Sequence, residues 1–397
     1  MKIVFLSYTF WPPYFGGELL MAEERLKEMA ARGHQVLVLT AGAEGYPSLE
    51  TVDGMQVYRS PFVGKNKVSR ILRYIFFWFW SLGKLFSIPE IDVVHFNSLP
   101  GFETITSNLY GGVAAWIAHC KKARTVTVHS LASEEENYFT QNFWQRIFFH
   151  FVDYLVCVGD GLFDAAKTVY PEKSIKILYG VHDDLFTPLS HDSRKEFRRF
   201  NGISETDVVF AFLGSIVRRK GFDLVAEVFS EVYPQHNNWR LWVIGPRNRA
   251  ENQNINEQEV SQVTAPLIGM NEVVKYWGRI DDRGSLAQIL GASDVFVFPT
   301  RREGMPISPL EAMSTGLPLI ISKLPGVTDL ANIEGQTGLY VTPGNKEELR
   351  SAMVKLAEDK SLRETMGRAA RRRIVDHFSW QQHVDRWEQL YLGEFKE

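Results

Sequence analysis

The sequence predicts an α/β protein of two Rossmann-like domains that face each other across a cleft, with a C-terminal helix crossing back to the first domain. The 397 residues exceed one ordinary core and suit two domains. Short β-rich runs alternate with longer helical patterns in both halves of the chain, as in parallel sheets covered by helices. A polar segment around Pro188 separates the two series, so we expect the domain boundary there.

The first half opens on a strand and a helix. Apolar residues of "GGELLMAEERLKEMAARG" recur at helical spacing between the first two strands, and Gly33 ends this helix. The seven expected strands are Lys2–Tyr8, His34–Ala41, Met55–Pro61, Asp92–Asn97, Thr125–His129, Tyr154–Gly159 and Ile175–Gly180. We assign residues 1–183 to an N-terminal domain.

The second half repeats this architecture without repeating the sequence. Its expected strands are Val208–Ser215, Arg240–Pro246, Val273–Ile280, Val295–Thr300, Leu317–Ser322 and Gly338–Pro343. Ligands of such sheets bind at the carboxyl ends of the strands. We assign residues 184–377 to a C-terminal domain, and residues 378–397 to a helix that packs back on the first domain.

Composition excludes several classes of protein. The chain is 45% hydrophobic and 23% charged, as in a globular protein, and its net charge of −3 does not suggest a nucleic-acid binder. Its two cysteines have no metal-ligand spacing and read as small buried residues. The first apolar run reads as a strand rather than a signal peptide, so we expect a cytoplasmic protein.

The segment "PTRREGMPISPLEAMSTGLPLIIS" carries the strongest functional signal. A strand ends at Thr300, Pro306 suits the first turn of a helix, and Gly316 marks its end. Backbone N–H groups near Ile307 and Ser308 point outward with the positive end of the helix dipole. An anionic diphosphate fits there.

Two carboxylates accompany this helix. Glu311 lies about five residues into it, and helical side chains lean toward the N-terminus, so Glu311 can accept hydrogen bonds from ribose hydroxyls. Glu303 precedes the helix and would face the sugar beyond the phosphates. Two glutamates at this spacing, taken by themselves, are more often surface carboxylates than ligand-binding residues. The surrounding sequence pattern favours a role in ligand binding here.

Two glycine-containing loops supply further candidates. In "FLGSIVRRKGFDL", Arg219 and Lys220 follow a strand, where cations can neutralise a departing diphosphate. A solvent-exposed basic loop is the alternative. Gly16 and Gly17 open the first helix, where backbone can approach a phosphate closely, although a simple turn also needs glycine. The pattern is not the GxGxxG of dinucleotide-binding enzymes.

These motifs together resemble the retaining family called glycosyl transferases group 1, or glycosyltransferase family four, which has the GT-B architecture. The resemblance covers nearly the whole chain. It rests on Glu303 and Glu311 in "EGMPISPLEAMSTGLP", with seven residues between them, on "DVFVFPT", "GVTDL" and "TGLYVTPGN" in order, and on the N-terminal "PPYFGGELLMAEERLKEMAARGHQVLVLT".

The resemblance implies transfer of a hexosyl unit from a nucleotide diphosphate sugar, UDP-linked as is commonest in the family. The acceptor would be a saccharide or a lipid-linked saccharide in polysaccharide or glycolipid biosynthesis. Catalytic roles fall on Glu303, Lys220 and His129, although a strand-end histidine such as His129 is more often structural. The implied donor-binding residues are Gly16, Gly17, Ser215, Arg219, Lys220, Arg279, Ile280, Glu303, Gly304, Met305, Pro306, Ile307, Ser308 and Glu311.

The chain departs from the family at several positions. Ser215 replaces a frequent arginine, so Arg219 would supply the charge. Asn97 stands where a second histidine is usual, and the turn after Tyr179 differs. No DxD-type cluster stands in a convincing loop, so we expect neither metal nor cofactor. A glycogen-synthase-like polymerase, a sugar-nucleotide epimerase and a non-catalytic nucleotide-sugar-binding protein stay open as alternatives.

The segment Lys65–Phe86 is basic at its start and rich in aromatic residues. Its apolar core is too short to span a bilayer but could lie among lipid headgroups. A helix buried against the first sheet is the alternative. The basic residues expected to meet anionic lipid are Lys65, Lys67, Arg70 and Arg73.

Overall fold

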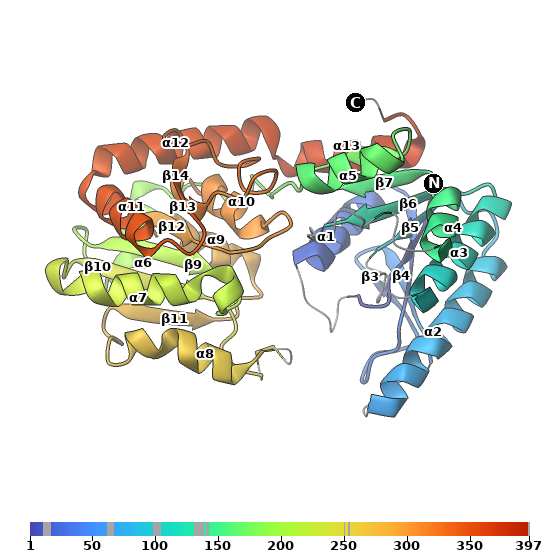
Figure 1. Cartoon of the computed structure of the whole chain (residues 1–397), viewed down its shortest axis with the longest axis horizontal. Helices are drawn as coiled ribbons and strands as arrows, with labels where there is room; N and C mark the ends of the chain where they lie inside the picture. Colours follow the sequence, from blue (N-terminus) through green and yellow to red (C-terminus); the bar gives the residue numbers. More distant parts are fainter. Residues whose placement is uncertain are drawn as a thin grey trace. The chain divides into compact units, whose positions relative to one another are not determined.

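The computed structural model describes residues 1–10, 17–61, 67–97, 105–130, 139, 143–249, 251–252 and 255–395. The chain divides into two compact units (Figure 1). Unit 1 holds Met1–Tyr179 and His383–Glu397, and unit 2 holds Gly180–Gln382. Each unit contains one sheet of its own, six or eight strands wide, and the predicted α/β class with two Rossmann-like units is confirmed.

Unit 1 is built on an eight-stranded sheet in the order β3-β4-β2-β1-β5-β6-β7-β8. All its neighbouring strands are parallel except β3 and β4. Its strands are β1 Lys2–Leu6, β2 Gln35–Thr40, β3 Leu49–Val52, β4 Met55–Arg59, β5 Val93–Phe96, β6 Arg124–His129, β7 Tyr154–Cys157 and β8 Ser174–Lys176. Its helices are α1 Gly17–Ala31, α2 Lys67–Ser87, α3 Ile105–Cys120, α4 Phe143–Phe151 and α5 Asp160–Val169.

The hairpin of β3 and β4 was missed by the sequence analysis. Both turn residues, Asp53 and Gly54, have positive φ angles of 48° and 79°. An Asp-Gly pair between two short strands is a hairpin signal, because both positions of the turn favour left-handed backbone. The signal was present, but β3 is only four residues long and none of its side chains is buried.

The C-terminal helix α13, Trp380–Leu392, ends within unit 1. Trp387 stacks on His95 of β5 with ring centroids 5.3 Å apart, and the guanidinium of Arg25 lies 3.8 Å over the Trp387 ring. Tyr391 lies 2.6 Å from Nδ1 of His95. These buried aromatic contacts fix the end of the chain on the sheet of unit 1.

Unit 2 is built on a parallel six-stranded sheet in the order β11-β10-β9-β12-β13-β14. Its strands are β9 Val208–Leu213, β10 Trp239–Ile244, β11 Val274–Gly278, β12 Val295–Phe298, β13 Leu319–Ser322 and β14 Gly338–Val341. Its helices are α6 His191–Phe200, α7 Phe222–Val232, α8 Glu257–Thr264, α9 Arg283–Gly291, α10 Ile307–Ser314, α11 Lys346–Glu358 and α12 Lys360–His377.

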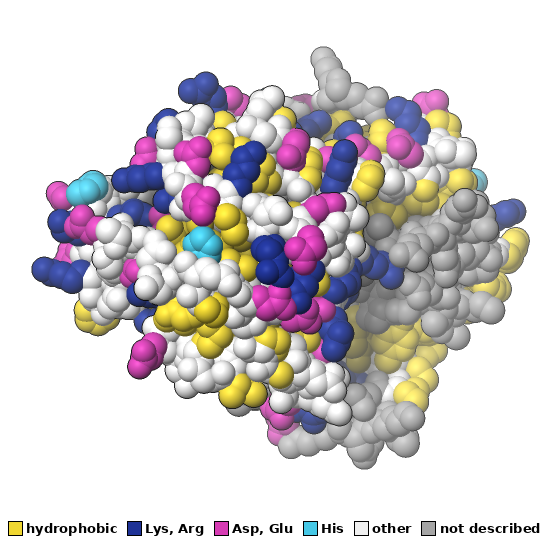
Figure 2. Space-filling model, turned by 60° about the vertical axis from the view of Figure 1, so that its left-hand side comes forward, with side chains coloured by type: hydrophobic (Ala, Val, Ile, Leu, Met, Phe, Trp, Pro, Cys, Tyr) yellow, Lys and Arg dark blue, Asp and Glu magenta, His cyan; other side chains and the backbone are white. Residues whose placement is uncertain are grey.

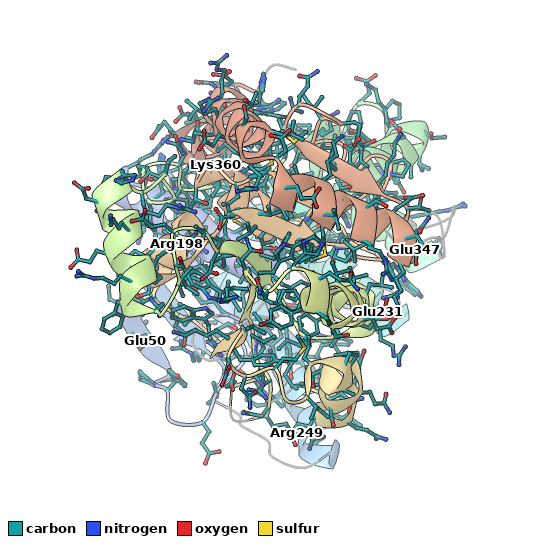
Figure 3. All side chains as sticks on the ribbon, turned by 90° about the vertical axis from the view of Figure 1, so that its left-hand side faces the viewer. Glu50, Arg198, Glu231, Arg249, Glu347 and Lys360 are labelled. Atoms are coloured by element: carbon teal, nitrogen blue, oxygen red, sulfur yellow. The ribbon has the colours of Figure 1, made fainter. Side chains whose placement is uncertain are left out.

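Charged side chains of unit 2 have two distinct roles. Acidic and basic groups are interspersed over the face shown in Figure 2. Surface pairs such as that of Arg350 with Glu347 contribute little to stability. Arg198, labelled in Figure 3, is instead buried. It donates to Asp294 at 2.8 Å and to the carbonyl of Asp207 at 2.6 Å, which ties α6 to the sheet.

Strand order reverses once in each sheet, and these switch points locate the candidate sites. In unit 2 the chain runs from β9 outward through β10 and β11, then returns to add β12 on the other side of β9. In unit 1 the corresponding neighbours are β1 and β5. Loops after two such strands diverge and leave room for a ligand at the carboxyl edge of the sheet.

Candidate active site

Lys220 and Glu303 form a largely buried ion pair at the switch point of unit 2. Lys220 ends the short turn after β9, Glu303 lies in the loop after β12, and Nζ of Lys220 donates to Oε2 of Glu303 at 2.7 Å. Their side chains are 16% and 6% exposed. Because taking charges out of water is costly, such a pair is weak evidence for stability and marks a candidate functional site.

The Glu303 carboxylate accepts from two further donors. Nη1 of Arg219 lies 3.2 Å from its Oε1, and Oγ1 of Thr300 donates to the same oxygen at 2.8 Å. Two cations thus surround one carboxylate. The local charge is positive, which suits an anionic ligand such as a diphosphate.

Burial lowers the pKa of the Lys220 ammonium below its ordinary value, and the neighbouring Glu303 carboxylate acts in the opposite direction. The ammonium also lies 5.3 Å over the ring of Phe298. Desolvation strengthens any interaction between this cation and an incoming phosphate, because there is little competing water.

The two loops that carry Lys220 and Glu303 are fixed to each other through the backbone. The carbonyl of Arg219 accepts from the N–H of Arg301 at 2.8 Å. Arg301 also binds both carboxylate oxygens of Asp223, at 2.7 and 2.9 Å. Gly221 has a φ of +76°, and a Cβ there would lie 1.9 Å from the carbonyl oxygen of Pro299. Only glycine permits this close approach, so the site is held rigidly before a ligand arrives.

The helix that follows Glu303 begins as the sequence predicts. Pro306 is the N-cap of α10, with no side-chain cap, and Ile307 and Ser308 lie in the first turn. Gly304 lies in the turn before it, and the Met305 side chain is buried. The first N–H groups of a helix have no intrahelical partner and attract anions. The start of α10 and the loop that carries Lys220 therefore both lie at the carboxyl edge of the sheet of unit 2.

Glu311 is buried on α10 and already has a partner. Nη1 of Arg283 donates to its Oε1 at 2.6 Å, and the same guanidinium lies 4.8 Å over the ring of Phe186. A ribose bound at Glu311 would share this carboxylate with Arg283, a residue that sequence analysis did not select.

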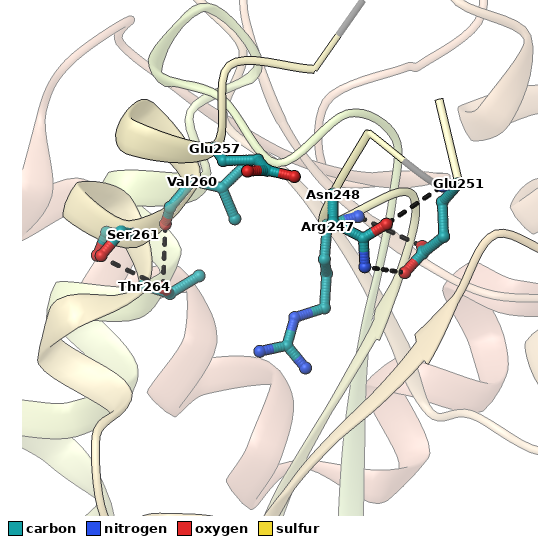
Figure 4. Close-up of a pocket in the computed structure, with 7 residues that line it drawn as sticks. All are labelled: Arg247, Asn248, Glu251, Glu257, Val260, Ser261 and Thr264. Atoms are coloured by element: carbon teal, nitrogen blue, oxygen red, sulfur yellow. Dashed lines mark hydrogen bonds between the residues drawn. The ribbon is translucent and has the colours of Figure 1, made fainter. Parts of the chain in front are cut away.

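Glu251 organises the loops after β10 and β11 and was also missed. Its Oε2 accepts from the N–H groups of Arg247 and Arg279, both at 3.2 Å, and Asn248 donates to its Oε1 at 3.0 Å. Figure 4 shows Arg247, Asn248 and Glu251 beside a cavity of about 320 Å³ between this loop and α8. Arg279 and Ile280, expected to border a nucleobase, are half-buried in the loop that Glu251 holds.

The remaining candidates are spread over both units. Ser215 is half-buried directly after β9 and Gly214. Gly17 is the first residue of α1 in unit 1, and Gly16 lies outside the described residues. His129 ends β6 in unit 1, against Phe139 and Phe149. Burial lowers the pKa of His129 to about 3, so its imidazole is neutral near pH 7.

No described group of three or more His, Cys, Asp and Glu residues has the arrangement of a metal site. Across the described helices, none combines the length and the apolar character needed to cross a membrane. Arg73 was expected to meet lipid headgroups, and this expectation is wrong. Its side chain is buried, with the guanidinium 5.3 Å over the ring of Tyr8.

Comparison with known families decides the class. Residues 193–373 match the family model described as glycosyl transferases group 1, and residues 16–211 match the model described as glycosyltransferase family 4. The two models overlap and together span most of the chain. The chain belongs to this glycosyltransferase family.

Individual relatives agree with this assignment. The capsular polysaccharide biosynthesis glycosyltransferase CapM of Staphylococcus aureus is 27% identical over 301 residues, 74% of this chain and 76% of the relative. The Escherichia coli UDP-Gal:alpha-D-GlcNAc-diphosphoundecaprenol alpha-1,3-galactosyltransferase is 27% identical over 329 residues, 79% and 78% of the two chains. The structure of Anabaena Alr3699/HepE with UDP and glucose superposes with a TM-score of 0.74 at 17% identity, covering 99% of this glycosyltransferase and 100% of that chain.

Proposed function

We propose that this glycosyltransferase moves a hexosyl unit from a UDP-hexose to a saccharide or lipid-linked saccharide acceptor, with the anomeric configuration retained and no metal required. The observation that carries the proposal is the Lys220–Glu303 pair at 2.7 Å, flanked by Arg219 at the switch point of unit 2. The relatives named above support the nucleotide and the acceptor class, because one uses UDP-Gal and another acts in capsular polysaccharide biosynthesis.

In the proposed reaction the bond between the anomeric carbon and the diphosphate breaks, and its electron pair leaves with the diphosphate. Lys220, Arg219 and the first N–H groups of α10 stabilise that negative charge. Glu303 meets hydroxyls of the donor hexose. An acceptor hydroxyl attacks the same face of the sugar, which retains the configuration, and its proton passes to an oxygen of the departing diphosphate. Neutral His129 takes part through hydrogen bonds rather than as a cation.

Transfer from UDP-glucose tests this proposal. We expect a thermal shift with UDP-glucose or UDP-galactose that exceeds the shift with GDP-mannose, because binding to the folded state raises its melting temperature. The reaction is run with EDTA in excess. Proton NMR of the transfer product, or of the sugar released by slow hydrolysis of the donor, should show the same anomeric configuration as the donor. Inverted product, or complete loss of turnover in EDTA that divalent metal restores, contradicts the proposal.

The lowered pKa of Lys220 predicts an alkaline limit to activity. The charged ammonium is the form that binds diphosphate, so activity is present below the pKa of Lys220 and is lost as the pH rises through it. Because burial lowers that pKa, the decline of kcat/KM should begin below the ordinary lysine value of about 10.4. In Lys220→Arg the decline should move to higher pH, since guanidinium stays protonated. An unchanged decline contradicts this role.

We further propose that the segment Lys65–Phe86 reaches a membrane surface. Phe77 and Leu85 of α2 are buried, whereas Phe79 and Phe86 are each 73% exposed. Exposed aromatic residues on an amphipathic helix suit the headgroup region. The double variant Phe79→Ser/Phe86→Ser should sediment less with anionic liposomes than the unchanged chain. Phe200→Ser, which removes an 89% exposed ring from α6, is the matched control. Equal sedimentation of all three contradicts the proposal.

A further inference from the structure

Asn97 carries a buried carboxamide that makes no hydrogen bond to the protein. Its side chain is 1% exposed, and neither its Oδ1 nor its Nδ2 has a partner. Among the asparagine and glutamine side chains that the structure describes, it alone has both amide atoms buried and unpaired. Other buried amides are at least partly satisfied: Oδ1 of Asn332 accepts from Thr337 at 2.8 Å. A protein rarely leaves both groups of an amide unpaired, because each costs stability.

Asn97 lies at the carboxyl edge of the sheet of unit 1, the edge at which parallel sheets bind ligands. The N–H of Asn97 donates to the carbonyl of Leu6 at 3.0 Å, so the pairing of β5 with β1 continues through Asn97. These are the two strands at the switch point of unit 1. In the topology of unit 2 the equivalent strands are β9 and β12, whose following loops carry Lys220 and Glu303. Each sheet thus has polar side chains at the same topological point.

Side-chain alternation along β5 separates Asn97 from the apolar core. Phe96 packs against Phe148 with ring centroids 5.5 Å apart, on the face covered by α2, α3 and α4. His95 points to the other face, where it meets Trp387 and Tyr391. Asn97 shares the face of His95 one step further along, at the carboxyl edge of the sheet.

The chemistry of a free carboxamide selects the class of ligand. It offers one acceptor and a pair of donor hydrogens side by side. A phosphate presents acceptors only and would leave Oδ1 unpaired. A sugar hydroxyl both donates and accepts, and two neighbouring hydroxyls can satisfy both ends of the amide at once.

We propose that Asn97 is a specificity residue that hydrogen-bonds one or two hydroxyls of the saccharide acceptor. The inference rests on the proposed function, since it needs an acceptor sugar. Binding of the correct acceptor fills the unpaired groups, whereas an acceptor without those hydroxyls leaves them unpaired. Sites of this kind discriminate strongly between substrates that differ by one hydroxyl.

Asn97→Leu tests the proposal, because leucine matches the shape of asparagine and removes the polar atoms. Two kinds of acceptor probe are used: free hexoses, and N-acetylglucosamine linked through a diphosphate to a decyl chain. The donors are UDP-glucose and UDP-galactose. We expect kcat/KM for the accepted probe to fall about tenfold or more. The rate at which water hydrolyses the donor should stay within about twofold of that of the unchanged chain. The affinity for UDP should also stay within about twofold. The melting temperature should be equal or higher, since an unpaired buried amide has been removed.

The deoxy analogues of the accepted probe give the sharpest readout. One of them should be transferred poorly by the unchanged chain, and Asn97→Leu should lose nothing further on that analogue, because the same contact is already absent. Asn332→Leu is the matched control: it should melt at lower temperature and discriminate the analogues as the unchanged chain does.

Three outcomes overturn the inference. Acceptor kinetics of Asn97→Leu equal to those of the unchanged chain remove the role in specificity. A large drop in its melting temperature shows that the amide is a structural group. If the unchanged chain binds no nucleotide sugar and modifies no probe, the proposed function itself fails, and this is recognised before any variant is compared.

Discussion

Replacing Lys220 by alanine should lower the turnover of UDP-hexose by roughly 10²–10³-fold, because one preorganised charge contact to the departing diphosphate is lost. This corresponds to ~2.7–4 kcal/mol of barrier. The measurement is kcat with UDP-glucose, normalised to folded protein by circular dichroism. Arg219 and Thr300 still bind Glu303 in this variant, so the loop retains two of its three side-chain contacts to that carboxylate.

Lys346→Ala is the matched control for Lys220→Ala. Lys346, the first residue of α11, pairs with the half-exposed Glu227 at 3.3 Å and also with Glu231, both on α7, and has no contact with Glu303. Surface pairs contribute little, so this variant should keep nearly normal turnover. Near-normal turnover of folded Lys220→Ala would remove Lys220 from the mechanism.

Gly221→Ala should have the second large effect, on both folding and catalysis. The new Cβ would meet the carbonyl oxygen of Pro299 at 1.9 Å, and backbone atoms cannot rotate away as a side chain does. The turn that carries Arg219 and Lys220 must then move from the loop after β12. We expect a loss of stability larger than the ~1–2 kcal/mol cost of left-handed backbone alone. Urea unfolding and kcat together measure the effect.

Gly269→Ala separates conformational strain from the clash. Gly269 has a φ of +84°, and a Cβ there would meet nothing within 4 Å. This control has the strain without the collision, so it should be mildly destabilised and retain turnover per folded molecule. If both variants behave alike, the contact between Gly221 and Pro299 does not position the site.

The core strands could be predicted from the sequence because apolar runs of four to six residues recur between helical patterns. All thirteen expected strands are present, with ends that coincide or differ by up to four residues. The missed strand, β3, is the four-residue sequence LETV on an edge, where no side chain is buried and burial does not impose alternation. Edge strands of this kind are recognised from their turn, here Asp53-Gly54, rather than from their own pattern.

The candidate site was predictable where it depends on local motifs. Pro306 and the helix after it, the Lys220 loop and Glu303 could all be selected from strand–loop–helix spacing. The contact partners could not, because they come from distant parts of the chain. Arg283 binds Glu311 across 28 residues, and Arg279 meets Glu251 across the same number. For Arg73, the sequence led to a contact that the structure does not have. Its charge suggested a contact with lipid headgroups, whereas its guanidinium lies over the ring of Tyr8 in a buried cation–π contact.

The most direct test is a crystal structure of the chain with bound UDP. We expect a phosphate oxygen within hydrogen-bond distance of Nζ of Lys220, and the diphosphate in contact with the N–H groups of Ile307 and Ser308. A diphosphate held elsewhere, for instance beside Arg247 in the cavity next to α8, with Lys220 still bound only to Glu303, would contradict this expectation.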